Sequence, residues 1–328
     1  MGLGKYVLKR VGTGLVTFFF VIVLNFFIFW IMPGDPVALL VYGIPGMTPE
    51  QIERLIHVLG LDRPWYMLFL SYLVNIFTFN FGVSFSQFRP VSSILLEALP
   101  YTILLLVPAT IGSVFVGMKL GVKSAWNYGK KSDLSTLITS LVFYSMPIFW
   151  LGMFMILIFG FYLRLFPIAG VMSSFWLWVD PLSNPLVFVL DILWHMFLPC
   201  LTLILFLFGG YYLIMRNTML DTLTQDYIVT AKAKGASDRA VMYKHAQKNA
   251  MLPMITVIVL AFATIFSGAV LTETIFSWPG MGRLMYTAAM AQDYPVLWGT
   301  FSILAMLVVF ANILADILYG YLDPRIKY

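Results

Sequence analysis

The sequence predicts an all-α integral membrane protein with six transmembrane helices and an external helical insert between the first two. Hydrophobic residues make up 61% of the 328 residues and charged residues only 11%, whereas soluble domains are typically about 45–50% apolar. Six apolar runs are each long enough to cross a hydrocarbon core of about 30 Å. Most of the charged residues lie between these runs.

The first apolar run covers residues 11–32 and follows Lys5, Lys9 and Arg10. It exceeds the apolar core of a signal peptide, which is about 7–15 residues long, and no small-x-small cleavage pattern follows it. It leads instead into the turn sequence PGDP at residues 33–36. Residues 1–32 are therefore expected to be a cytoplasmic N-terminus and the first transmembrane helix.

Residues 33–98 form a polar-to-amphipathic insert that is predicted to lie outside the membrane and to contain two helices. Thr48 and Gln51 have the spacing of a capping box at the start of the first helix. Apolar residues then follow at helical spacing, namely Ile52, Leu55, Ile56 and Leu59. A second helix is expected to begin near Pro64 and to place one apolar face against the bundle, made of Leu68, Phe69, Tyr72, Leu73 and Ile76.

Residues 99–328 are expected to form a five-helix core. Its apolar runs lie near 99–121, 134–163, 196–215, 251–275 and 296–319. Pro108 and Pro147 fall inside two of these runs and are expected to kink the helices, for structural reasons or for gating. Trp278, in a Trp-Pro-Gly turn after the fifth run, suits a membrane interface.

The distribution of positive charge predicts the orientation. Of the 20 Lys and Arg residues, 15 fall in the segments that would face inward and five in the segments that would face outward. Because Lys and Arg are retained on the cytoplasmic side, both termini and the loop 216–250 are predicted to be cytoplasmic.

The longest polar interval in the second half of the chain runs from Gln225 to Pro253. It is predicted to form two short helices. Asp226 caps the first and Gly235 ends it by adopting the left-handed conformation. Ser237 starts the second, a basic helix that ends at Pro253. Such a loop suits contact with another protein, although a solvated loop attracted to acidic headgroups would have a similar composition.

Several short sequences in this chain resemble one family. They are PGDP at 33–36, LGLDRP at 59–64, TAKAKGAS at 230–237, NAMLP at 249–253, FSWPGMGRL at 276–284, QDYPV at 292–296 and LDPRIKY at 322–328. In order and spacing they are similar to the B-type permease subunits of ATP-binding-cassette importers for oligopeptides, dipeptides and nickel. At the positions of the generic importer motif, Glu-Ala-Ala, the chain has Val229, Thr230 and Ala231, and only Ala231 agrees with the motif.

The resemblance implies that this chain forms half of a translocation pathway in a prokaryotic inner membrane. The implied partners are a second homologous permease, two ATP-binding subunits that hold ATP and magnesium, and an extracellular solute-binding protein. Short peptides are the expected substrates, with oligosaccharides and nickel chelates as alternatives. The residues expected to contact the ATPase subunit are Asp226, Tyr227, Thr230, Ala231, Lys232, Ala233, Lys234, Gly235, Ala236 and Ser237.

The sequence carries no pattern for enzyme activity. The nearest approach to a phosphate-binding loop, SAWNYGKK at 124–131, lacks the first Gly and the final Ser or Thr. His57, His195 and His245 are isolated, so no metal site or other cofactor is expected in this chain. The basic residues flank apolar runs, which indicates a topology signal rather than nucleic-acid binding.

Two other classes of membrane protein are alternatives to an importer permease. An ion-coupled secondary carrier would need charges near the middle of the membrane, but Glu273 and Asp316 lie near the ends of runs. A membrane-bound receptor or assembly factor would use the insert to bind protein. For a transport pathway, the small and polar residues Ser267, Gly268 and Thr272 are possible lining residues.

Overall fold

The computed structural model describes residues 3–31, 48, 50–51, 53–54, 57, 62–264 and 270–322. Within these ranges the secondary structure is helical. The β-type pairing in the described residues is an isolated antiparallel bridge between Val83 and Pro90. The all-α membrane fold predicted from the sequence is confirmed. Its apolar helices are long because each must satisfy its own backbone hydrogen bonds in lipid.

Four helices in the described ranges are long and apolar enough to cross a membrane. They are α1 (Leu3–Ile31), α5 (Val91–Trp126), α8 (Pro185–Leu223) and α14 (Tyr294–Leu322). A fifth span is obtained if α6 (Lys131–Ser145) is joined to α7 (Ile148–Met155) and the π-helical turn η1 (Ile156–Tyr162), which follow at a bend of 102°.

The predicted span 251–275 corresponds to α11 (Gln247–Thr264) and α12 (Val270–Ile275). Residues 265–269 lie between them and outside the described residues. The count of six transmembrane helices therefore stays a prediction.

The two predicted proline kinks have different outcomes. Pro147 stands at the start of α7, and Met146 before it is extended, with φ −73° and ψ 132°. Proline disfavours the helical conformation of the residue before it, so the helix breaks here. Pro108 instead lies inside the continuous helix α5, because one missing amide hydrogen bond is tolerated in a packed membrane helix.

Helices α5 and α8 form the most extensive pair, and α1 packs against α14. Two glycines four residues apart, Gly117 and Gly121, allow α5 to approach the α8 backbone closely. A Cβ atom built on Gly117 would lie 2.7 Å from the carbonyl oxygen of Phe208. Small residues at this spacing are typical of close helix pairs in membranes.

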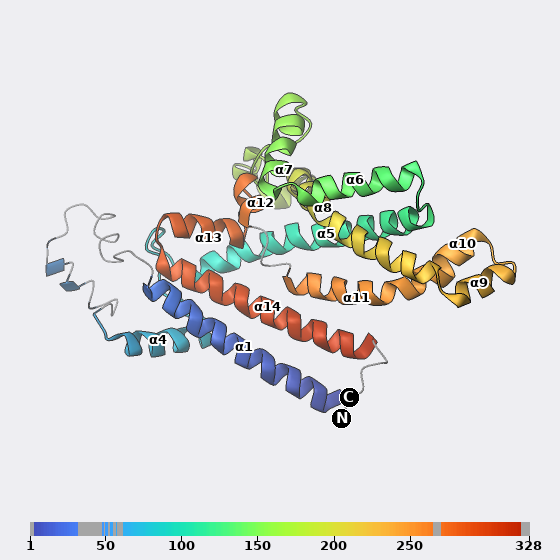
Figure 1. The fold of residues 1–328 in the computed structure, drawn as a ribbon. Coiled ribbons are helices and arrows are strands. Elements are labelled where there is room, and N and C mark those ends of the chain that lie inside the picture. The colour runs from blue at the N-terminus through green and yellow to red at the C-terminus, as the bar shows by residue number, and fades with distance from the viewer. Residues whose placement is uncertain are drawn as a thin grey trace.

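Short helices lie at the two ends of the bundle (Figure 1). The start of α1, the end of α14, and the helices α9 (Asp226–Ala233) and α10 (Asp238–Ala240) lie toward one end. Helices α4 (Trp65–Phe77) and α13 (Met281–Met290) lie toward the other. The 3-10 turns η2 (Ser174–Leu177) and η3 (Pro181–Ser183) precede α8.

The insert contains both local structures that the sequence predicted around Thr48 and Pro64. The amide of Gln51 donates to Thr48 Oγ1 (3.4 Å) and the amide of Thr48 donates to Gln51 Oε1 (2.9 Å), so the capping box is confirmed. Helix α4 begins directly after Pro64 and buries Tyr72 and Ile76. The predicted apolar residues Ile52, Leu55, Ile56 and Leu59 lie outside the described residues.

Candidate coupling site

The predicted coupling loop begins almost directly at the end of a membrane helix. Helix α8 ends at Leu223 and α9 begins at Asp226, with only Thr224 and Gln225 between them. The predicted capping role of Asp226 is wrong, because Gln225 occupies the N-cap position and Asp226 is the first helical residue. Its carboxylate still lies at the helix N-terminus, where the helix dipole favours negative charge.

Gly235 ends α9 as the sequence predicted. Its φ is +81°, and its amide donates to the Lys232 carbonyl (2.9 Å), while the Ala236 amide donates to the Ala231 carbonyl (3.2 Å). This pair of hydrogen bonds is the Schellman motif, which satisfies carbonyls that the helix end leaves free. A side chain is rarely tolerated at this φ, so the break between the two helices depends on glycine.

The second helix starts at Ser237, whose hydroxyl accepts from the Ala240 amide (3.4 Å). Its predicted end at Pro253 is wrong. The π-helical turn η4 (Val241–Ala246) follows α10 and leads directly into α11, which contains Pro253. The basic segment and the following apolar segment are thus one run of helix, because loss of one amide donor does not interrupt it.

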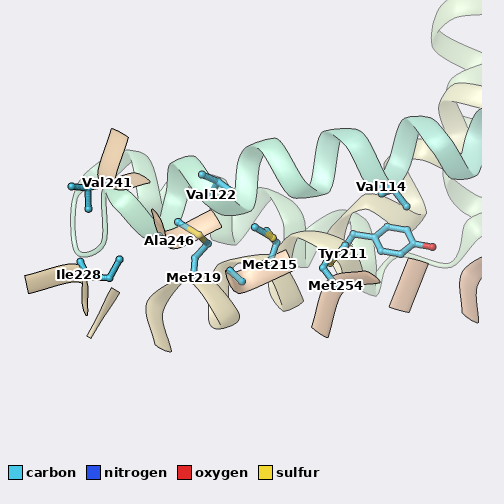
Figure 2. Close-up of a cluster of buried hydrophobic side chains, with 11 residues drawn as sticks. Val114, Val122, Tyr211, Met215, Met219, Ile228, Val241, Ala246 and Met254 are labelled. Carbon is cyan, nitrogen blue, oxygen red and sulfur yellow. The ribbon is translucent and has the colours of Figure 1, made fainter. Parts of the chain in front are cut away.

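The underside of α9 is buried in an apolar cluster at the end of the bundle (Figure 2). Ile228 belongs to one cluster of buried side chains that also contains Val122 of α5, Met215 and Met219 of α8, and Val241 of η4. Ile228 is only 1% exposed. Because packed side chains of this kind resist relative displacement, α9 is attached to the ends of α5, α8 and α11.

The side of α9 that faces away from the apolar cluster, here called its upper side, is exposed, and so is the turn after the helix. Ala231 is buried and Ala236 is half-buried, so neither presents much surface to a partner. The other predicted coupling residues are exposed, namely Asp226, Tyr227, Thr230, Lys232, Ala233, Lys234, Gly235 and Ser237.

Two apolar side chains on the same loop, Val229 and Tyr243, were not among the predicted contact residues. They are 63% and 50% exposed. An exposed valine and tyrosine beside lysines suit the core of a protein interface. The sequence signal that could have identified Val229 is its position directly after Ile228, which places the two side chains on different faces of one helix.

A buried polar network lies close to the coupling site, and the sequence did not predict it. The Tyr212 and Ser124 hydroxyls are 2.6 Å apart, and Ser124 donates to the Asp133 carboxylate. The Gly129 amide also donates to Asp133 (3.2 Å). The network joins α5, α6 and α8, and its members are separated by up to 88 positions, so no local pattern identifies it.

Of the three predicted pathway residues, the structure describes only Thr272. Ser267 and Gly268 lie outside the described residues. Thr272 is buried on α12, and its hydroxyl has no hydrogen-bond partner among the described residues. The lining role of all three stays a prediction.

The side chain of Trp278, which was predicted to suit a membrane interface, is covered by protein. It is fully buried against α5, where its indole Nε1 donates to the Tyr101 carbonyl (2.8 Å). This hydrogen bond offsets the cost of removing the indole N–H group from water. The Trp-Pro-Gly turn is therefore part of the packed end of the bundle.

The fold and the coupling site together describe a helical membrane protein with several spans and an exposed helix–Gly–helix loop at one end. Residues 3–106 match the model of the N-terminal region of binding-protein-dependent transport system membrane components, and residues 113–328 match the model of the binding-protein-dependent transport system inner membrane component. The chain belongs to this family of multi-pass inner-membrane permease components, which are not catalytic enzymes.

Three curated relatives are similar along nearly their whole length. The dipeptide transport system permease protein DppB of Escherichia coli K12 is 36% identical over 338 residues, with 99% of both chains covered. The di/tripeptide transport system permease protein DppB of Pseudomonas aeruginosa is 36% identical over 333 residues, also with 99% of both covered. The oligopeptide transport system permease protein AppB of Bacillus subtilis is 35% identical over 327 residues, with 99% of this chain and 100% of AppB covered.

Proposed function

We propose that this chain forms half of the translocation pathway of an ATP-binding-cassette importer for short peptides. The similarity to permeases named for dipeptides, di/tripeptides and oligopeptides, at 35–36% identity over nearly the whole chain, supports peptides as the substrate class. Oligosaccharides and nickel chelates are the alternative substrates to be tested.

The proposed complex contains a second homologous permease, two ATP-binding subunits and an extracellular solute-binding protein. ATP and magnesium would be held by the ATP-binding subunits, so this chain contributes no catalytic residue. Both termini and the loop 216–250 would face the cytoplasm, which agrees with the excess of Lys and Arg in these segments.

The construction of α9 is the observation that carries the coupling role. Its underside is held by Ile228 and Ala231, its upper side is exposed, and it follows α8 after only two residues. A partner bound to the upper side would therefore displace the end of α8 as it moved. ATP would shift the permease between inward and outward access only if this contact differed in energy between the two states.

Site-directed cross-linking tests the docking surface. The chain has a single cysteine, Cys200, so Cys200→Ser provides a background for single-cysteine variants. Thr230→Cys and Lys234→Cys place a thiol on the exposed face of the coupling loop. Lys130→Cys is the matched control, because Lys130 is also exposed and lies in the loop between α5 and α6 at the same end of the bundle.

Co-purified candidate ATPase subunits are expected to cross-link to residues 230 and 234 much more than to residue 130. The yield of cross-linked product should depend on which nucleotide is added. Equal labelling of all three positions, or labelling that depends only on the content of acidic lipid, would support a solvated loop instead.

Uptake into vesicles tests the transport role. The reconstituted complex should import labelled dipeptide when ATP is inside a vesicle with the coupling loop on the same side. Import driven by a proton or sodium gradient without any ATPase subunit would support a secondary carrier. If oligosaccharide or nickel chelate competed for import and unlabelled peptide did not, the proposal of peptides as substrates would be wrong. The proposed coupling role would not be affected.

A further inference from the structure

Helix α4 has no charged side chain in its 13 residues, WYMLFLSYLVNIF. One face packs on the membrane helices: Tyr72 and Ile76 form a cluster with Phe18, Ile22 and Phe26 of α1. This face was expected from the sequence. The opposite face consists of Tyr66, Met67, Leu70, Val74 and Phe77, and all of these side chains are exposed.

This exposed stripe is continuous with the surface that α1 presents to the membrane. The rings of Phe27 and Trp65 are 6.1 Å apart, and the Trp65 ring lies 6.1 Å from that of Tyr66, the first residue of the stripe. Leu24 and Ile28 are exposed on the same candidate span of α1, Val7–Ile28. The two helices therefore share one apolar surface, and that of α1 lies against lipid because α1 is a membrane span.

The helix is too short to cross the membrane. At about 1.5 Å per residue it is about 20 Å long, against a hydrocarbon core of about 30 Å. Asp62 and Arg63 precede it and Asn80 follows it, so both ends lead into polar sequence.

A buried polar contact fixes the depth of α4. The amide of Asn25, six residues before the end of α1 at Ile31, donates to the Tyr72 hydroxyl (2.8 Å), which lies 3.2 Å from the Ser302 hydroxyl of α14. Hydrogen bonds between helices in an apolar medium hold the elements in register. Tyr72 is thus attached to two membrane spans at a level where Asn25 is surrounded by apolar residues.

We propose that α4 is a half-inserted helix whose exposed stripe of Tyr66, Met67, Leu70, Val74 and Phe77 contacts lipid acyl chains. It would lie in the leaflet at the end of the bundle opposite α9. The insert between the first two spans is then partly a membrane structure rather than a wholly aqueous one. This inference depends on the membrane fold and not on the transport function proposed above.

Nitroxide labels in the Cys200→Ser background test the proposal in the full chain, reconstituted in vesicles of phosphatidylethanolamine and phosphatidylglycerol. Leu70→Cys and Val74→Cys report on the stripe. Leu24→Cys is the lipid-facing reference on α1, and Arg63→Cys is the aqueous reference just before α4. Accessibility of each label to oxygen, which concentrates in lipid, is compared with accessibility to a water-soluble nickel chelate.

The ratio of oxygen to nickel accessibility at residues 70 and 74 is expected to match that at residue 24 and to exceed that at residue 63. A ratio equal to that at residue 63 would place α4 in water and overturn the proposal. Low accessibility to both reagents would also overturn it, because a protein segment would then cover the stripe. The use of two positions guards against one variant that fails to fold.

Discussion

Arg216 of α8 and Asp133 of α6 form a buried bidentate ion pair. Arg216 Nε lies 2.8 Å from Asp133 Oδ1, and Nη2 lies 2.8 Å from Oδ2. The side chains are only 11% and 5% exposed. The planar guanidinium matches a carboxylate in this geometry. The pair therefore holds the start of α6 against the end of α8, close to the coupling loop.

Removal of either partner of this pair is expected to destabilise the protein strongly. Arg216→Met or Asp133→Leu alone should lower the free energy of unfolding by about 3–5 kcal/mol, because a buried charge is left without its partner. The double variant should recover much of this loss. Unfolding of the purified chain in mild detergent measures the effect.

An exposed ion pair in the same chain is the control. Arg89 and Glu97 form an ion pair with side chains 39% and 64% exposed, and Glu97→Gln should cost less than about 1 kcal/mol. If Asp133→Leu were no more destabilising than Glu97→Gln, the buried pair would not stabilise the fold.

The glycine that ends α9 can be tested against a second glycine with the same backbone conformation. Gly235 and Gly129 have φ of +81° and +78°, and no atom lies within 4 Å of a Cβ built on either. Alanine at each position should therefore cost about 1–2 kcal/mol for conformational reasons alone. Only Gly235→Ala should also reduce the stimulation of a co-purified ATPase by substrate, because only Gly235 belongs to the coupling loop. Equal effects of the two variants on stimulation would argue against a special role of this loop.

The close approach of α5 and α8 should not tolerate larger residues at Gly121. A Cβ there would lie 2.9 Å from the Tyr212 carbonyl oxygen, and backbone atoms cannot move aside. Gly121→Ala is expected to cost about 1–3 kcal/mol through overpacking.

Gly112 on the same helix is the matched control for Gly121. A Cβ on Gly112 would lie 2.7 Å from Cδ1 of Ile204, which is the end of a side chain and can move aside more easily than backbone, so Gly112→Ala should cost less than Gly121→Ala. Thermal unfolding in detergent distinguishes the two, and a larger loss for Gly112→Ala would contradict the packing argument.

Glu273 stabilises the start of α13. Its buried carboxylate accepts from the amides of Gly282 (2.8 Å) and Arg283 (3.1 Å) and from the hydroxyl of Thr102 (2.8 Å). Glu273→Gln replaces one carboxylate oxygen with an NH2 group, which cannot accept a hydrogen bond from a backbone amide. The start of α13 would be capped less well, so faster hydrogen exchange is expected in α13. The cost should be about 1–3 kcal/mol.

Thr274→Val is the control for the cap, since the Thr274 hydroxyl donates only to the Val270 carbonyl of its own helix. Exchange in α13 should be unchanged in this variant. Unaltered exchange in Glu273→Gln as well would show that the carboxylate does not cap α13.

Thr272 allows the predicted pathway role to be separated from a structural one. Its buried hydroxyl has no partner among the described residues, so Thr272→Val should leave stability unchanged or slightly raised. If the residue lines the pathway, peptide flux should nevertheless change. Thr300→Val is the control, because the Thr300 hydroxyl donates within its own helix to Val296. Unchanged flux in Thr272→Val, and after bulky substitution of Gly268, would remove the lining prediction.

Features with a local cause could be predicted from the sequence. The apolar runs predicted the long helices, because a chain in lipid must satisfy its own backbone groups. Thr48 and Gln51 predicted a capping box, and Gly235 predicted the end of α9, because both depend on hydrogen bonds between residues a few positions apart.

The contacts between distant residues and the exposure of each surface could not be predicted in this way, because they depend on how the helices pack. The sequence did not indicate that Asp133 pairs with Arg216, that Trp278 is buried against Tyr101, or that Pro147 breaks a helix while Pro108 does not. It also placed Ala231 among the contact residues, although packing buries it. These outcomes depend on how α5, α6 and α8 pack, and helix packing is determined by many weak contacts between residues far apart in the chain.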